Sequence, residues 1–168
     1  MQKWIVGSIG AVAGGIVLMF ALAPLREIST EIEIAAPPSQ VWAVLADTKA
    51  YPEWNPEIAA LNGAWVVGGR LENREGYGPD QQVFWPLVMV AQPGVELRWA
   101  GRIGVPRLFD VEHYFLLRAV DGGTRFVQGE KFHGVALWFF DVRQLLVQFE
   151  AMNMALKARA EAQVKNGI

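Results

Sequence analysis

The chain has 168 residues, of which 52% are hydrophobic, and a formal net charge of −2. This length predicts one domain plus a short additional segment, and a charge near zero without a basic block argues against a nucleic-acid partner. The absence of cysteine excludes disulfides, thiolate metal sites and cysteine nucleophiles. Two histidines, His113 and His133, are too few for a multi-histidine metal centre, so we expect no metal and no cofactor.

An uncharged run covers residues 4–25, between Lys3 and Arg26. As a helix it would be about 33 Å long, enough to cross a hydrocarbon core of about 30 Å. We interpret residues 1–26 as the transmembrane anchor of a single-pass membrane protein. The charges beside the run favour an extracytoplasmic position for the rest of the chain.

Two further interpretations of this run remain open. A cleaved signal peptide could end near Ala21-Leu22-Ala23, although Pro24 follows directly. The Gly10-x-x-x-Gly14 spacing is compatible with weak pairing into a homodimer, or with docking to a partner membrane protein. Glycine is also simply common in membrane helices, which would give the spacing no special role.

The following segment predicts a half-buried strand and two short helices. Residues 27–34 alternate between isoleucine or threonine and glutamate or serine, which is typical of a strand with one buried face. Ala35-Ala36-Pro37-Pro38 ends the strand, and an apolar stripe on Val41, Trp42, Val44 and Leu45 predicts a helix. Residues 47–50 predict a second short helix, and the prolines in 51–56 predict an irregular turn.

Short strands with antiparallel neighbours account for the middle of the chain. Turn-forming Gly, Pro and Asp residues separate six candidate strands. The predicted strands are 57–61, 70–75, 81–91, 95–100, 109–120 and 124–132. Pro86 within the third of them predicts an edge or a bulge.

A long amphipathic helix is predicted at residues 141–164, which contain neither Pro nor Gly. Asp141 is suited to begin this helix, and residues 165–167 are suited to end it. Its apolar positions recur at steps of three and four, so they share one side. They are Val142, Leu145, Leu146, Phe149, Met152, Leu156 and Ala160. A helix of this kind needs a large apolar surface to lie on, and we expect a curved sheet wrapped around it with a cavity between them.

Three segments resemble the SRPBCC superfamily, the START-like helix-grip proteins, and in particular its polyketide cyclase/dehydrase branch. They are EIAAPPSQVWAVLADTKAYPEWNP, GGTRFVQGEKFHG and FEAMNMALKARAE. The resemblance implies an α+β helix-grip fold, with a seven-stranded curved antiparallel sheet around the C-terminal helix and an apolar cavity. It makes residues 27–168 the ligand-binding domain. The superfamily contains lipid carriers, hormone receptors and cyclases, so the fold alone leaves the function open.

The hairpin 109–132 predicts which residues face the cavity. A two-residue Gly122-Gly123 loop would pair His113 with Phe132, Phe115 with Glu130 and Leu117 with Gln128, all on one face. Adding inward residues of other elements gives the candidate cavity lining: Trp54, Trp85, Leu97, Trp99, His113, Phe115, Leu117, Gln128, Glu130, Phe132, Phe149, Met152, Asn153 and Leu156. For each of them, simple core packing is the alternative. Residues 135–140 are expected either to touch a bilayer or to fold inward.

The sequence therefore favours a membrane-tethered domain that binds a lipid or another hydrophobic small molecule. The alternative function is a polyketide cyclase/dehydratase-like enzyme that uses Glu130 and His113 as an acid/base pair on an aromatic or polyketide-like substrate. Glu130 and His113 have a third interpretation, because buried polar groups commonly hydrogen-bond only to fix a hairpin.

Overall fold

A computed structural model describes residues 14–167 and has the predicted α+β class. After a helix at residues 14–21, β1 (Leu25–Ile34) leads to α2 (Pro38–Ala46), the 3-10 turn η1 (Thr48–Ala50) and α3 (Tyr51–Trp54). The remaining strands are β2 (Ile58–Asn62), β3 (Glu72–Glu75), β4 (Gln82–Phe84), β5 (Leu87–Gln92), β6 (Glu96–Ile103), β7 (Phe109–Val120) and β8 (Gly123–His133). The 3-10 turn η2 (Gly78–Asp80) precedes β4. The turns η3 (Val135–Trp138) and η4 (Val142–Leu145) precede α4 (Leu146–Lys165).

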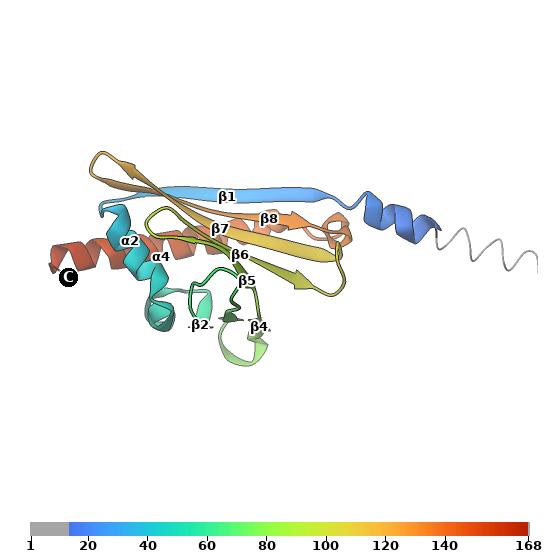
Figure 1. Ribbon diagram of the computed structural model, residues 1–168, viewed down its shortest axis with the longest axis horizontal. Helices are drawn as coiled ribbons and strands as arrows, with labels where there is room; N and C mark the ends of the chain where they lie inside the picture. The colour runs from blue at the N-terminus through green and yellow to red at the C-terminus, as the bar shows by residue number, and fades with distance from the viewer. Residues whose placement is uncertain (1–13, 168) are drawn as a thin grey trace, which may run out of the picture.

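The main layer is a five-stranded antiparallel sheet in the order β1-β8-β7-β6-β5, with α4 running along one face (Figure 1). The predicted curved sheet and long C-terminal helix are thus confirmed. The stripe of α4 lies in the core, since Phe149, Met152, Leu156 and Ala160 are all buried. Asp141 does cap, but it accepts from the N–H of Arg143 at the start of η4, so a 3-10 turn precedes the α-helix.

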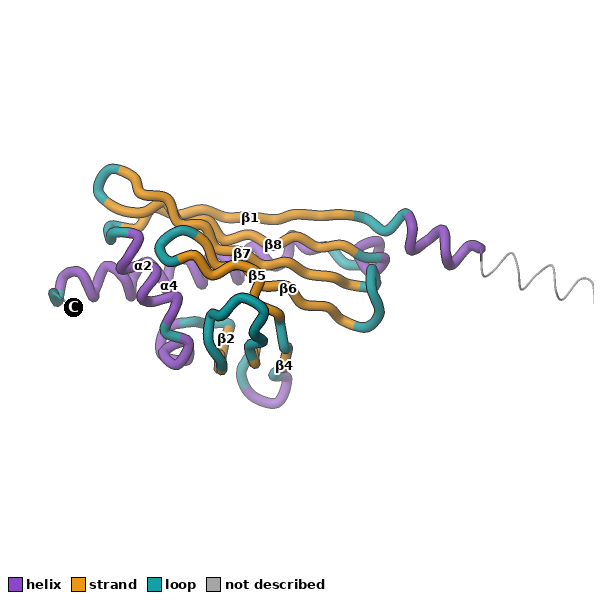
Figure 2. Tube along the Cα trace, viewed as in Figure 1, coloured by secondary structure: helices purple, strands orange, loops and turns teal. Residues whose placement is uncertain are grey.

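A second, three-stranded sheet in the order β2-β3-β4 lies beside the first (Figure 2). Within residues 14–167 the strands thus form sheets of five and three strands, instead of the single seven-stranded sheet that the resemblance implies. The predicted strand 81–91 is divided into β4 and β5 at Trp85-Pro86, where proline has no N–H to donate. Backbone hydrogen bonds still join the sheets, because the N–H of Leu71 donates to the Pro86 carbonyl (3.1 Å) and that of Val88 donates to Gly69 (2.8 Å).

The register of the β7–β8 hairpin differs from the prediction by two residues. The turn is Asp121-Gly122, and Val120 pairs with Gly123. Gly123 belongs to the strand because the end of β1 crosses it closely. A Cβ on Gly123 would lie 2.0 Å from the carbonyl oxygen of Ile34. A shift of two residues keeps every side chain on its predicted face, so the inward set is unchanged.

The predicted single-pass membrane topology is wrong for the part of the chain that the structure describes. None of the helices within residues 14–167 is long and apolar enough to cross a membrane. The physical reason is visible at the end of the apolar run. The carbonyl of Pro24 accepts from the N–H of Gly134, and Leu25 already pairs with His133 in the sheet. Residues 4–13 of the run, and Gly10 of the pairing motif, lie outside the described residues.

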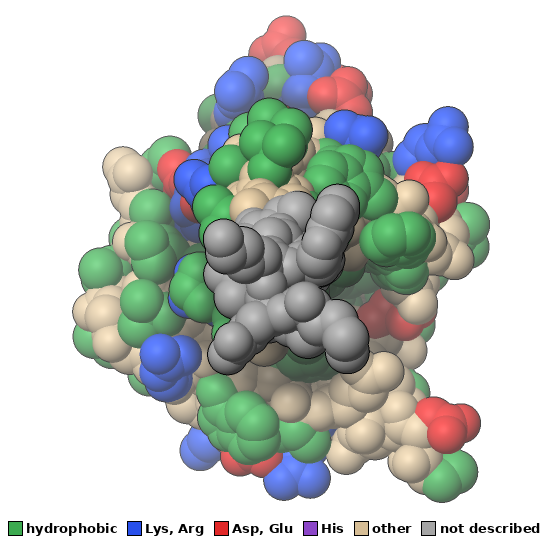
Figure 3. Space-filling model, turned by 90° about the vertical axis from the view of Figure 1, so that its right-hand side faces the viewer, with side chains coloured by type: hydrophobic (Ala, Val, Ile, Leu, Met, Phe, Trp, Pro, Cys, Tyr) green, Lys and Arg blue, Asp and Glu red, His purple; other side chains and the backbone are tan. Residues whose placement is uncertain are grey.

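The segment 135–140 divides between the core and the surface. Val135 and Leu137 are buried, whereas Phe139 is 90% exposed. Hydrophobic side chains are numerous on this end of the molecule, from which the helix 14–21 emerges (Figure 3). Leu22, Leu25 and Val105 are also exposed. The expectation that the segment folds inward therefore holds for Val135 and Leu137, whereas contact of the exposed side chains with a bilayer stays a prediction.

Candidate functional site

A row of polar and aromatic side chains crosses the inner face of the five-stranded sheet. Trp99 of β6 pairs with His113 of β7, and His113 pairs directly with Glu130 of β8. The Trp99 and His113 rings are stacked, with centroids 4.4 Å apart and 14° between their planes. On its other side, His113 Nδ1 lies 3.5 Å from Glu130 Oε1. The predicted pair of titratable groups thus lies side by side on the inner face.

Gln128 links this row to α4. Its Nε2 lies 3.4 Å from His113 Nε2 and 3.5 Å from the sulfur of Met152. Because the Gln128 amide nitrogen can only donate, we assign the neutral His113 tautomer that carries its proton on Nδ1, towards Glu130. The ring of Phe149 also contacts His113, with a centroid distance of 5.3 Å. Side chains of the helix and the sheet are therefore in direct contact here.

Glu75 of β3, in the smaller sheet, interacts electrostatically with Glu130 and His113. Asn73 Nδ2 donates to Glu75 Oε1 over 2.6 Å. Burial, followed by the nearby charge of Glu130, raises the pKa of Glu75, while His113 and the Asn73 hydrogen bond lower it. Yet the side chain of Glu75 has surface open to water.

We call Asn73, Glu75, His113, Gln128 and Glu130 the inner polar cluster. It lies between two separate apolar clusters of the core, one containing Phe115 and Leu156 and the other containing Phe132 and Phe149. Buried polar groups without a structural partner are costly, so they mark places where a ligand or water is needed.

Several polar atoms around this region are buried and lack a hydrogen-bond partner among the described residues. They include Oε1 of Gln128, Oδ1 of Asn73 and Nε1 of Trp54. Oδ1 of Asn153 and Nδ2 of Asn55 complete the set, which then contains three acceptors and two donors. His113, Glu75 and Glu130 are not arranged as a metal-binding group, and none was found within residues 14–167.

Most of the predicted cavity residues lie in the interior, which fits cavity lining and simple core packing equally. Ten are buried: Leu97, His113, Phe115, Leu117, Gln128, Phe132, Phe149, Met152, Asn153 and Leu156. Trp54, Trp99 and Glu130 are half-buried. Trp85 departs from the prediction, because it lies at the break between β4 and β5 with 61% of its surface exposed. Its neighbour Phe84 pairs with Asn73 and takes the inward position.

Glu75 and Asn73 were missed by sequence reasoning, although a signal was present. Leu71 is apolar and is buried in the structure, so the alternation of a strand places residues 73 and 75 on its face. The polar character of both residues favours the solvent side when β3 is considered alone. The signal that links Glu75 to the cluster is its charge interaction with Glu130 of β8 and His113 of β7, which the sequence of β3 alone does not contain.

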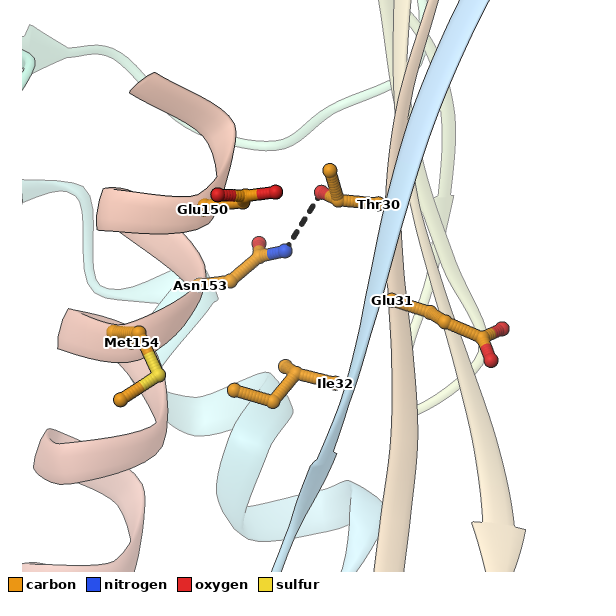
Figure 4. A pocket seen from close by; sticks show the side chains of 6 residues that line it. All are labelled: Thr30, Glu31, Ile32, Glu150, Asn153 and Met154. Carbon is orange, nitrogen blue, oxygen red and sulfur yellow. Dashed lines mark hydrogen bonds between the residues drawn. The ribbon is translucent and has the colours of Figure 1, made fainter. Parts of the chain in front are cut away.

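A separate groove of about 400 Å³ opens between β1 and α4. Thr30 and Ile32 project into it from β1, and Glu150, Asn153 and Met154 project from α4, whereas Glu31 points away (Figure 4). Asn153 Nδ2 donates to Thr30 Oγ1 over 2.8 Å and bridges the two elements. Thr30 pairs with Gln128 in the sheet, so this bridge separates the groove from the inner polar cluster.

The sequence profile of the family described as "Polyketide cyclase / dehydrase and lipid transport" matches residues 26–166. The chain belongs to this polyketide cyclase/dehydrase family. The match covers both sheets and α4, and it confirms the resemblance to SRPBCC proteins noted from the sequence. A comparison with curated proteins found no match.

Solved structures share the fold of this polyketide cyclase/dehydrase family member at low sequence identity. Protein CV1439 from Chromobacterium violaceum is 18% identical with a TM-score of 0.68, over 80% of this chain and 96% of that one. The Zhui aromatase/cyclase from Streptomyces sp. R1128 is 15% identical with a TM-score of 0.68, over 84% and 96%. Ara h 8.0201 is 12% identical with a TM-score of 0.63, over 83% and 99%.

Proposed function

We propose that the chain binds a ring-containing hydrophobic small molecule next to the inner polar cluster, within residues 27–168. The observation that carries this proposal is the cluster itself: titratable groups and unpartnered polar atoms surrounded by Trp99, Phe115 and Phe149. Apolar walls with a few polar groups are typical of small-molecule sites. The aromatase/cyclase neighbours and the family description support the same class of ligand.

A titration with the neutral probe N-phenyl-1-naphthylamine tests this function. We expect saturable binding with one probe per chain. Trp99→Ala removes an aromatic wall next to His113 and should weaken binding roughly 2- to 10-fold, the worth of one aromatic contact. Trp85→Ala is the matched control and should leave affinity unchanged, since that ring faces outward. Probe binding that never saturates, or equal losses in both variants, would contradict the proposal.

Catalysis at the same site is the second candidate. It is favoured by one observation, the direct opposition of His113 and Glu130 on neighbouring strands at 3.5 Å. Such a pair can take a proton from a substrate and return it in a cyclisation or dehydration. Glu130→Gln should then abolish turnover of an aromatic or polyketide-like substrate while probe binding persists. Retention of full turnover in this variant would exclude the acid/base role.

A further inference from the structure

Strand β1 lies at one edge of the five-stranded sheet, and among the strands within residues 14–167 it pairs with β8 alone. The carbonyl of Glu33 points away from β8, because it accepts from Lys157 Nζ of α4 over 2.6 Å. In an antiparallel strand, the main-chain N–H and C=O groups of every second residue point to the same side. The main-chain groups of Glu31, Ser29 and Glu27 therefore point to the open edge as well.

Helix α4 satisfies only one end of this edge. Glu161 Oε1 accepts from the N–H of Ala35 over 2.8 Å, so Glu161 and Lys157 supply one acceptor and one donor, as a neighbouring strand would. Further along, the groove of about 400 Å³ separates α4 from β1. Glu31 lines this groove although its side chain points away, so its main chain lies along it (Figure 4). Within residues 14–167, no hydrogen bond is formed on this side of Ser29 or Glu31.

The side chains beside the open edge are mainly acidic. Glu27, Glu31 and Glu33 share the outer face of β1, and Glu150 projects into the groove from α4. Arg125 of β8 lies opposite Glu33 and bonds to it at 3.0 Å. In the described part of the chain, neither Glu31 nor Glu150 has a cation at ion-pair distance. A second copy of β1, paired antiparallel about the centre of the open stretch, would bring Glu27 opposite Glu31, and like charges in that position are destabilising.

We propose that the open edge of β1 binds an extended basic peptide, which adds to the sheet as a further antiparallel strand. Alternate residues of such a peptide point to opposite faces. Its Lys or Arg side chains would lie opposite Glu31 and Glu27 on the outer face. The aliphatic side chains between them would enter the groove beside Ile32 and Met154. This surface lies outside the proposed ligand site, so the two proposals stand or fall separately.

Isothermal titration calorimetry with a designed heptapeptide tests this surface. The probe is acetyl-Lys-Val-Lys-Leu-Lys-Val-Lys-amide, and its acidic counterpart has Glu in place of every Lys. We expect one basic peptide to bind per chain with a dissociation constant of about 10 to 100 μM, as a small interface allows. The acidic peptide should bind at least about 10-fold more weakly.

Methylation of the peptide backbone separates strand addition from simple charge attraction. In the antiparallel pair, the Lys residues direct their N–H groups to β1, whereas the Val residues direct theirs to solvent. Methylating the amide nitrogens of the two inner Lys residues should weaken binding roughly 10- to 100-fold, because two hydrogen bonds are lost. Methylating those of the two Val residues keeps the same charge and should leave affinity within about 2-fold.

Variants and hydrogen exchange test the protein side of the contact. Glu31→Lys should weaken binding roughly 3- to 10-fold, since a like charge then faces the peptide. Asp80→Lys makes the same charge change on an exposed turn of the smaller sheet and is the matched control. Amide hydrogen exchange measured by NMR needs no variant. Bound peptide should slow exchange at Ser29 and Glu31, whereas Thr30, which already pairs with Gln128, should stay unchanged.

The outcomes decide the proposal. Equal losses on the two methylations, or in Glu31→Lys and Asp80→Lys, would mean attraction by net charge alone and would overturn it. Equally tight binding of the acidic peptide, or unchanged exchange at Ser29 and Glu31, would overturn it as well. A chain that sediments as a dimer, with these amides already protected, would mean that a second copy occupies the edge in place of a basic peptide.

Discussion

The hydrogen bond between Asn153 of α4 and Thr30 of β1 gives a quantitative test of how much the contact between these two elements contributes to stability. Asn153 is 2% exposed, its Nδ2 donates to Thr30 Oγ1 over 2.8 Å, and its Oδ1 has no partner in the described part of the chain. Thr30→Val keeps the shape of the side chain but removes the acceptor. The whole buried amide is then unpaired, which should lower the free energy of unfolding by about 1 to 3 kcal/mol.

The reverse change should behave differently, because the two partners differ in exposure. Thr30 is half-buried beside the groove, where water can replace the lost amide. Asn153→Leu should therefore change the free energy of unfolding by less than about 1 kcal/mol. In the double variant both polar groups are gone, so we expect a value within about 0.5 kcal/mol of the single Asn153→Leu variant.

Urea denaturation monitored by far-ultraviolet circular dichroism measures these differences for the four proteins of the cycle. A coupling energy of about 1 kcal/mol or more between the two positions is expected for a buried hydrogen bond. A loss below about 0.5 kcal/mol in Thr30→Val would refute the reasoning, because it would mean that the amide finds water or another partner at no cost.

Three further predictions concern the turn, the cluster and the helix. Gly123→Ala should lower the free energy of unfolding, measured by urea denaturation, by roughly 3 kcal/mol because its Cβ would clash with the Ile34 carbonyl. Gly122→Ala lies in open space at φ +79° and should lower it by about 1 to 2 kcal/mol. Equal losses in the two variants would contradict the observed register. The pKa of Glu75 is raised, so the folded protein loses stability as this carboxyl ionises. Glu75→Gln should therefore raise the melting temperature at pH 7 to 8, and this gain should vanish below the ordinary pKa of 4.5. A gain that stays constant with pH would refute this reasoning. Leu156→Ala should cost about 2 to 5 kcal/mol, and a cost below about 1 would show that α4 is loosely packed.

Periodicity was enough to predict the elements that carry the site. Strand β7 has the predicted bounds 109–120, and the stripe of α4 was found because steps of three and four specify a helix face without reference to a partner. The inward face of the hairpin also survived the error in register. An error of two residues preserves the face, and this is why His113, Gln128 and Glu130 were identified together.

The features that were predicted wrongly or missed all depend on contacts between distant parts of the chain. The place of Gly123 in the strand follows from the approach of Ile34, which lies nearly ninety positions earlier and leaves no local signal. The apolar run ending at Leu25 has the hydropathy of a membrane span, yet its last residue pairs with His133. Glu75 acquires its role only from Glu130 and His113 on other strands.

The break at Trp85-Pro86 has a consequence for engineering this scaffold. Because β2, β3 and β4 join the larger layer through few backbone hydrogen bonds, their side chains can be exchanged without disturbing the pairing of β6, β7 and β8. The side chains of the smaller sheet can thus change while those of the larger sheet stay the same. Libraries that vary positions 73, 75 and 84 should therefore change what the protein accepts while retaining its capacity to fold.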